Sequence, residues 1–214
     1  MDILIPVLIV GAIGLIAGVG LALASKFMAV PVDETQEKLR GALPGANCGA
    51  CGFSGCDGYA EALALGKAEP NKCAPGGADA AAALAEILGV EVEESEPLTA
   101  FIACRGTPEN TVSGYDYSGL RSCTAANLLH GGPLSCAYGC IGFGDCAAAC
   151  SFGALTLDGG RPEVCAEKCV ACGKCVKACP KGLISLVPKN AKVHIGCSNR
   201  SRGPAVAKDC RVSC

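Results

Sequence analysis

CVACGKCVKACPKGLI, residues 169–184, contains four cysteines at spacings of two, two and three residues, followed at once by a proline. The chain holds eighteen cysteines in 214 residues. So many thiols form a disulfide framework in a secreted protein, but in a reducing compartment they are metal ligands. The compartment therefore has to be predicted before the stretch can be interpreted.

The N-terminus predicts the compartment. Residues 3–24 are uncharged and almost wholly apolar, and a helix of that length crosses a hydrocarbon core of ~30 Å. A cleaved signal peptide is the alternative, but it needs a positively charged start and a shorter apolar stretch, whereas only Asp2 precedes this one. Because Lys26, Lys38 and Arg40 follow it, the positive-inside rule predicts a single-pass anchor in the cytoplasmic membrane, with the bulk of the chain in the cytoplasm.

A cytoplasmic location means reduced thiols that are able to bind metal. Residues 169–180 match the C-x2-C-x2-C-x3-C-P run of bacterial ferredoxins. Its four cysteines are Cys169, Cys172, Cys175 and Cys179, and Pro180 follows them. The first three thiolates of such a run bind one [4Fe–4S] cluster, and the fourth binds a second cluster. One run therefore implies a partner run elsewhere in the chain.

The candidate partner run is GCIGFGDCAAACSFGAL, residues 139–155. It places cysteines at the first, third and fourth positions, which are Cys140, Cys146 and Cys150. Phe143 stands where the second ligand belongs. The run has therefore lost one ligand.

The missing ligand has three candidates. Cys136 is preferred over Cys123 or Cys104, because a local replacement orders a shorter loop. The crossing rule then predicts one cluster on Cys150, Cys169, Cys172 and Cys175, and another on Cys136, Cys140, Cys146 and Cys179. If the degenerate run binds nothing, one cluster remains.

A separate set of four cysteines lies upstream: Cys48, Cys51, Cys56 and Cys73. Glycines between the first three let the backbone wrap closely around a compact group. Predicted helices over 56–68 and 78–88 return the chain so that the fourth cysteine closes the set. Structural zinc is the alternative, but zinc sites usually pair two short Cys-x-x-Cys knuckles, so the spacing favours a third [4Fe–4S] cluster.

These observations predict an α+β chain with strands over 154–157 and 183–187. With 29 Gly, no Trp and 4% aromatic residues, the chain has little material for a large apolar core, so its bound clusters must stabilise it. The predicted segments are an anchor (1–25), a polar linker (26–43), the four-Cys domain (44–90), an acidic linker (91–97), a two-cluster bacterial-ferredoxin-like domain (98–196) and the start of a further ferredoxin-like repeat (197–214).

The further repeat is inferred from two pairs of similar segments. VHIGCSN (193–199) matches AFIACRG (100–106) as a strand followed by a cysteine, and CRVSC (210–214) repeats the spacing of CAYGC (136–140). Six cysteines remain unassigned: Cys104, Cys123, Cys165, Cys197, Cys210 and Cys214. Either the sequence is a fragment, or the extra thiols serve a cluster that the spacing does not assign.

Some functions are disfavoured. The sequence shows neither a G-x-G-x-x-G after a strand nor a G-x-x-x-x-G-K-[ST] motif, so no nucleotide site is evident. A net charge of -2 and a pI near 5.7 argue against nucleic-acid binding.

The combination of an N-terminal membrane helix, CGACGFSGCDGYAEALALGKAEPNKCAPGG (48–77) and a ferredoxin module resembles the B subunits of Rnf electron-transport complexes along essentially the whole chain. The resemblance implies an enzyme that couples electron flow between ferredoxin and NAD to Na⁺ or H⁺ transport. It implies a subunit that accepts electrons from soluble ferredoxin and relays them to other membrane and peripheral subunits. It also implies a longer natural chain with further ferredoxin repeats.

The alternative to this role is a free-standing, membrane-anchored polyferredoxin. Such a carrier would show the same clusters but would purify alone, without membrane subunits.

Overall fold

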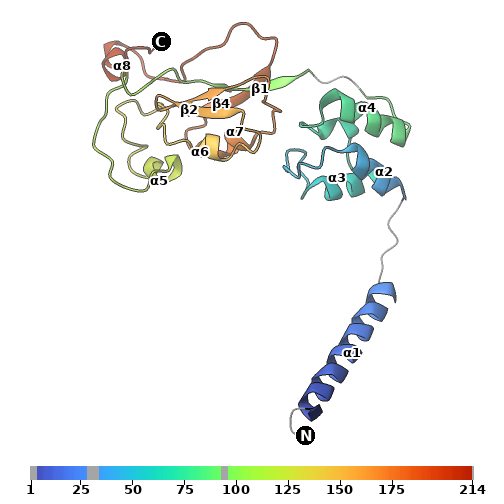
Figure 1. Cartoon of the computed structure of the whole chain (residues 1–214). Coiled ribbons are helices and arrows are strands. Elements are labelled where there is room, and N and C mark those ends of the chain that lie inside the picture. The colour runs from blue at the N-terminus through green and yellow to red at the C-terminus, as the bar shows by residue number, and fades with distance from the viewer. Residues whose placement is uncertain (1–3, 28–33, 93–95, 214) are drawn as a thin grey trace.

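The computed structural model describes residues 4–27, 34–92 and 96–213. It contains both helices and strands (Figure 1), which confirms the predicted α+β content. The predicted acidic linker 91–97 and the N-terminal part of the predicted polar linker include residues outside the described ranges. Cys214 also lies outside them.

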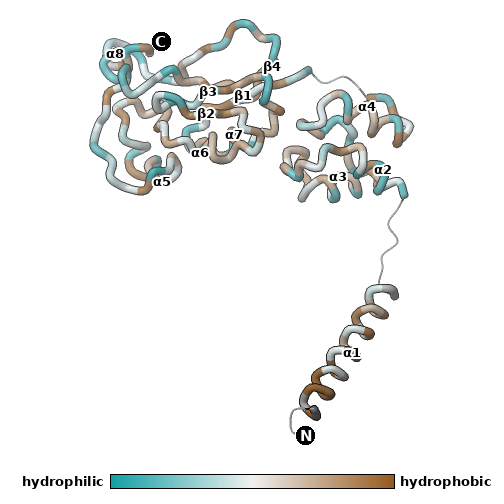
Figure 2. Tube along the Cα trace, in the orientation of Figure 1, coloured by the Kyte–Doolittle hydropathy of each residue, from teal (hydrophilic) through white to brown (hydrophobic). Residues whose placement is uncertain are grey.

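The first helix, α1, spans Leu4–Phe27. Its stretch Val7–Ser25 has a mean hydropathy of 2.6 and none of it is buried, and Figure 2 shows it as the most continuous apolar segment. Within the described residues it is the one helix long and apolar enough to cross a membrane. Its 24 residues extend about 36 Å, which exceeds the ~30 Å hydrocarbon core.

A small helical domain follows. It consists of α2 (Glu34–Ala42), α3 (Cys56–Ala64), the 3₁₀ helix η1 (Pro70–Lys72) and α4 (Gly77–Leu88). The largest fully buried side chains of its core are Leu39, Tyr59, Leu63 and Leu84. The two predicted helices over 56–68 and 78–88 are thus present, but α3 ends at Ala64, because Gly66 adopts a φ of 67° in the turn that follows.

The predicted boundary between linker and domain needs a correction. The polar linker predicted over 26–43 includes residues 34–42, but these residues form α2, which packs on α3 and α4. Leu39 is 0% exposed there. The domain therefore begins at α2, because burial of this leucine stabilises a short helix whose sequence is otherwise polar.

The second domain is built on two antiparallel pairs of strands. Strand β1 (Leu98–Ile102) pairs with β4 (Ile184–Pro188), and β2 (Leu155–Asp158) pairs with β3 (Arg161–Val164). The predicted strands over 154–157 and 183–187 are confirmed, each displaced by one residue. The cysteine loops lie in the two segments that connect these pairs, between β1 and β2 and between β3 and β4.

Three short helices lie among the loops of this domain: α5 (Cys123–Asn127), α6 (Asp145–Ala148) and α7 (Lys174–Ala178). Cysteines take part in the core, since Cys146, Cys169 and Cys175 pack with apolar residues of the strands. The core is therefore built around thiols as well as around aliphatic side chains.

The C-terminal part folds back onto the loop after β1. Helix α8 spans Pro204–Asp209, and the next residue, Cys210, forms an antiparallel bridge with Thr111. The expected strand over 193–199 is wrong, because these residues adopt no regular structure. Val193 and Ile195 are 88% and 76% exposed, so their side chains have no sheet to pack on.

Candidate iron–sulfur sites

In the helical domain, the thiols of Cys48, Cys51 and Cys56 lie near the thiol of Cys73. We call Cys48, Cys51, Cys56 and Cys73 the N-terminal site. Burial raises the pKa of the Cys73 thiol, the backbone N–H of Gly76 lowers it, and the nearby thiols of Cys56, Cys48 and Cys51 raise it further. The sulfurs of Cys56, Cys48 and Cys51 therefore each lie within electrostatic reach of the Cys73 sulfur.

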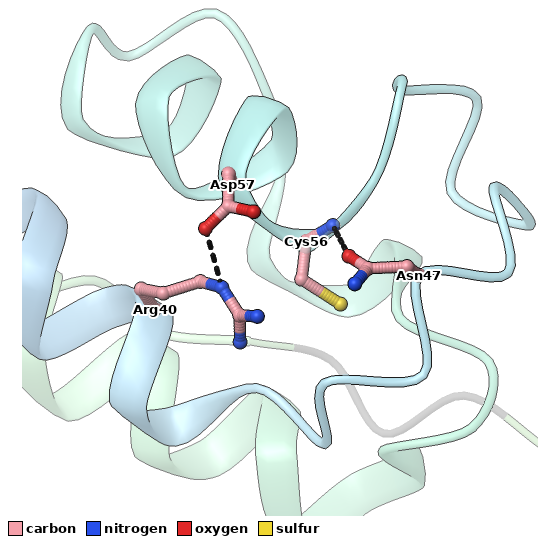
Figure 3. Close-up of polar contacts among 4 residues, drawn as sticks. All are labelled: Arg40, Asn47, Cys56 and Asp57. Atoms are coloured by element: carbon pink, nitrogen blue, oxygen red, sulfur yellow. Dashed lines mark hydrogen bonds and ion pairs between the residues drawn. The ribbon is translucent and has the colours of Figure 1, made fainter. Parts of the chain in front are cut away.

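Polar contacts fix the start of α3 beside this site (Figure 3). The Asn47 side-chain oxygen accepts a hydrogen bond of 2.8 Å from the backbone N–H of Cys56. Asn47 has a φ of 44°, a conformation that asparagine tolerates better than most residues. The Arg40 guanidinium donates to the Asp57 carboxylate at 2.6 Å, so α2 and the loop before α3 are both tied to the segment that carries Cys56.

Tyr59 positions the last cysteine of the site. Its hydroxyl donates to the carbonyl of Glu69 at 2.6 Å and accepts from the backbone N–H of Lys72 at 3.2 Å. These two contacts flank η1, which leads directly into Cys73. Burial raises the pKa of Tyr59 to about 12, so the phenol stays protonated and keeps donating at physiological pH.

The crossing predicted for the two runs is present in the second domain. Cys150 of the upstream run lines one cavity with three cysteines of the downstream run, and we call Cys150, Cys169, Cys172 and Cys175 the Cys169 site. The backbone N–H of Ala100, in β1, donates to the Cys169 sulfur at 3.4 Å.

The other crossed site differs from the prediction in one ligand. Cys140, Cys146 and Cys179 line a second cavity together with Cys123, and we call these four residues the Cys140 site. Cys136 does not line this cavity; it lies in a different one with three other cysteines. The preferred assignment of Cys136 to this cluster is therefore replaced by Cys123, one of the two alternatives.

Asp145 explains how a distant cysteine reaches the Cys140 site. Its carboxylate accepts hydrogen bonds from the backbone N–H groups of Cys123 and Thr124 at 2.9 and 3.0 Å, and from the Ser122 hydroxyl at 2.9 Å. Burial would raise the pKa of Asp145, but these donors outweigh it and lower the pKa. The charged carboxylate thus holds the start of α5 against the start of α6, where Cys146 lies.

Phe143, which occupies the lost ligand position, belongs to the same arrangement. Its ring lies 5.6 Å from the ring of Tyr117, and the Arg121 guanidinium lies 5.6 Å from its centroid. Both partners belong to the loop that leads into Cys123. The residue that removes one thiolate therefore packs against the segment that supplies its replacement.

Burial is the main influence on the thiols of Cys140 and Cys146. Burial raises the pKa of Cys140 to about 12 and that of Cys146 to about 11, and Cys123 contributes to both shifts. In the absence of a metal these thiols remain protonated at neutral pH. Binding of a cationic cluster core must therefore release protons, as expected for thiolate ligation.

The thiols supply the ligand set of a [4Fe–4S] cluster. Four cysteines line one cavity at the Cys169 site, and four others line another cavity at the Cys140 site. Clusters of this type are held by four cysteine thiolates.

Eleven of the twelve cysteines at these three sites agree with the assignment from the sequence, and Cys123 was one of its two alternatives to Cys136. The signal that was available is Ser122, a favourable N-cap residue directly before Cys123. In the structure its hydroxyl accepts from the N–H of Ala125 at 3.4 Å. A capped helix that begins with a cysteine would have indicated an ordered ligand at this position.

Two family models match the chain. One, described as "Putative Fe-S cluster", matches residues 43–75, and the other, a 4Fe-4S dicluster domain, matches residues 139–183. The first range contains the N-terminal site, and the second contains both ferredoxin runs. Iron–sulfur ligation at these cysteines is thus supported independently of the geometry.

Several relatives match almost the whole chain. The B subunit of a proton-translocating ferredoxin:NAD(+) oxidoreductase complex from Clostridium ljungdahlii is 41% identical over 100% of this chain and 76% of its own. The B subunit of a Na(+)-translocating ferredoxin:NAD(+) oxidoreductase complex from Acetobacterium woodii is 43% identical over 99% of this chain and 64% of its own. The B subunit of an ion-translocating oxidoreductase complex from Methanosarcina acetivorans is 37% identical over 96% and 78%. The chain therefore belongs to the family of B subunits of Rnf-type, ion-translocating ferredoxin:NAD⁺ oxidoreductase complexes.

Proposed function

We propose that this chain is the membrane-anchored electron-transfer subunit of an Rnf-type complex. It accepts electrons from reduced soluble ferredoxin and relays them to other membrane and peripheral subunits, within an enzyme that couples ferredoxin oxidation and NAD⁺ reduction to Na⁺ or H⁺ transport. The observation that carries the proposal is an identity of 37–43% with B subunits of such complexes over 96–100% of this chain.

Three [4Fe–4S] clusters are proposed for this role, at the N-terminal, Cys169 and Cys140 sites. Each cluster would carry one electron at a time. The chain supplies thiolates as ligands, and backbone N–H groups donate to ligand sulfurs, as Ala100 does to Cys169. Hydrogen bonds to ligand sulfurs, burial and nearby charge set the potential of such a cluster.

The crossed ligands suit a relay. Cys150 and Cys179 each leave their own run to complete the other site, so the two sites share their supporting chain. This sharing keeps the two clusters adjacent, which favours rapid electron exchange between them.

The location proposed for the subunit follows from α1. Positive charges on the C-terminal side of a single membrane-spanning helix support a cytoplasmic location for the two cluster domains. Soluble ferredoxin and the other subunits of the complex would meet the protein there. No nucleic acid is expected among its partners.

The test is affinity purification of the full chain from anaerobic membranes of its host, in mild detergent. The proposal expects polytopic membrane subunits to co-purify in fixed ratio. It also expects reduced ferredoxin to reduce the clusters, with loss of NAD⁺ reduction when the subunit is deleted.

The alternative function, a free-standing carrier, predicts a different result for the purification. A free-standing polyferredoxin would purify alone and would pass electrons to several unrelated reductases. That result would contradict membership in a complex while leaving the cluster sites intact.

A further inference from the structure

A fourth group of cysteines lines a cavity of its own in the second domain. From four separate segments, the chain brings together Cys104, Cys136, Cys197 and Cys210. We propose that these four residues, called the Cys104 site, hold a fourth [4Fe–4S] cluster. The site goes beyond the three clusters proposed above, and neither family model covers any of its cysteines.

The thiols of the Cys104 site are close and partly buried. Cys136 and Cys210 are only 9% and 8% exposed. Burial raises the pKa of Cys136, the backbone N–H of Tyr138 lowers it, and the thiols of Cys104, Cys210 and Cys197 raise it further. Each of the other three sulfurs therefore lies within electrostatic reach of Cys136.

The chemistry of the lining matches the other three sites. None of the described residues that line this cavity is an aspartate, glutamate or histidine, so the four thiols are its available metal ligands. No described group is placed to hold a single ion, and Cys104, Cys136 and Cys210 are free thiols. A small zinc site and a disulfide pair are therefore poorer occupants than a cubane.

Donors to sulfur are already present. The backbone N–H of Cys140 donates to the Cys104 sulfur at 3.4 Å, and the side-chain amide of Asn199 donates to the Cys136 sulfur at 3.6 Å. Hydrogen bonds of this kind stabilise the negative charge that a ligated thiolate and its cluster carry. A buried thiol in an ordinary apolar core has no need of them.

The backbone around the Cys104 site is fitted to it. The loop after Cys104 contains Gly106, where a Cβ atom would come within 2.7 Å of Thr111 and 3.5 Å of the Cys104 sulfur. Gly139 similarly would place a Cβ atom 3.3 Å from the Cys136 carbonyl oxygen. A larger residue at Gly106 would have to displace the Thr111 methyl group, and one at Gly139 would crowd the Cys136 carbonyl.

Backbone hydrogen bonds hold the C-terminal segment, which carries Cys210, at the Cys104 site. The N–H of Val112 donates to the carbonyl of Asp209 at 3.0 Å, and the N–H of Arg211 donates to the carbonyl of Asn110 at 2.8 Å. These bonds flank Cys210 on both sides. They bring a cysteine from the end of α8 beside one that follows β1.

The Cys104 site lies directly next to the Cys140 site. Cys140 is a ligand of one site, and its N–H donates to a ligand of the other. Lys181 interacts electrostatically with both Cys136 and Cys179, and its ammonium donates to the carbonyl of Ala137 at 2.6 Å. An electron that leaves one of these clusters can therefore reduce the next one.

The decisive experiment compares C123A, C136A and the double variant in the full chain, reconstituted anaerobically. If the two cysteines serve different clusters, each single variant should lose about four iron per chain, from about sixteen, and the double variant should lose about eight. If they serve one cluster, the double variant should lose no more than C136A alone. That outcome, or an unchanged iron content in C136A, would overturn the proposal.

Cys165 supplies the matched control. It is the described cysteine outside all four sites, and its thiol donates to the Glu167 carboxylate at 3.1 Å. C165A should keep the wild-type iron content. Iron content depends on neither ferredoxin nor partner subunits, so a negative result here is distinct from failure of the proposed function.

A second variant protects the test against misfolding of C136A. N199A removes one donor to the Cys136 sulfur but no ligand. An anaerobic redox titration followed by EPR should show a lower midpoint potential for one cluster and unchanged potentials for the others. If N199A shifts no cluster, the assignment of Cys136 to a cluster is wrong.

Discussion

At the scale of single residues, the Cys140 site depends on Asp145, which binds no metal itself. The carboxylate accepts from three different residues, Ser122, Cys123 and Thr124. Both oxygens are used as acceptors. A carboxylate is suited to this position because every partner is a donor, and charge-assisted hydrogen bonds of this kind are stronger than neutral ones.

The first prediction concerns D145N. Asparagine has one acceptor oxygen, and its NH₂ group would face donors, so at least one bond to the start of α5 is lost. A loss of about 1.5–3 kcal/mol should release Cys123 and speed removal of iron from this cluster by a chelator roughly tenfold or more. D158N, at the exposed end of β2, should behave like the wild type. Equal chelation rates for both variants would show that Asp145 does not position Cys123.

The second prediction concerns Y59F in the helical domain. Removing the hydroxyl leaves the carbonyl of Glu69 and the N–H of Lys72 without their partner, at a cost of about 1–3 kcal/mol. Cys73 should then leave its cluster more readily on heating, which loss of visible absorbance would report. Y117F is the control, because that hydroxyl is exposed and bonds within its own loop. An unchanged melting profile for Y59F would count against the proposed positioning role.

At the scale of elements, the two runs exchange their last cysteines. Assigning ligands in simple sequence order would place both of these cysteines at the wrong site. Cys179 follows α7 but lies with Cys140 and Cys146, whereas Cys150 follows α6 but lies with Cys169, Cys172 and Cys175. Each short helix therefore ends at a ligand for the other run's cluster.

The third prediction follows from this crossing. C179S should alter the EPR signal of the Cys140 site, and C150S should alter that of the Cys169 site. Cluster-specific isotope or spin-relaxation measurements on the reconstituted full chain can separate the two signals. If each substitution instead disturbs the cluster of its own run, the crossed assignment fails.

Much of this architecture could be predicted because ligand spacing is a short-range property. The run Cys169–Cys179 and the loop Cys48–Cys56 specify their own backbone paths, and strands after each run follow from local hydrophobic patterns. Helix α2 could not be predicted in this way. It owes its burial mainly to Leu39. This is a tertiary contact, and the polar sequence of the nine-residue helix does not predict it.

The sequence-based preference for Cys136 at the Cys140 site differs from the structure for a related reason. Preference for Cys136 rested on loop length, but the entropic cost of loop closure rises only slowly with length. The hydrogen bonds to Asp145 are enough to offset it. Cys136 instead lines another cavity, with three cysteines that are far apart in sequence.

At the scale of the whole chain, the four sites form a series. Cys73 of the N-terminal site and Cys169 of the next site line one cleft. The Cys169 and Cys140 sites share their runs, and the Cys140 and Cys104 sites share the contact between Cys140 and Cys104. With the proposed Cys104 site as its last member, this order would give electrons a continuous route through the two cluster domains.

The last prediction places this route relative to the membrane. Helix α1 is exposed along its length, and Lys38 and Arg40 follow it in the sequence while only Asp2 precedes it. A chain truncated after Leu43 and fused to alkaline phosphatase should be inactive, whereas the matching fusion to green fluorescent protein should fluoresce. Deleting residues 3–24 should release the rest of the chain from membranes with its iron content unchanged, because the cluster ligands all lie outside α1. Phosphatase activity would reverse the topology, and a mature N-terminus beyond residue 24 would identify the apolar stretch as a cleaved signal peptide.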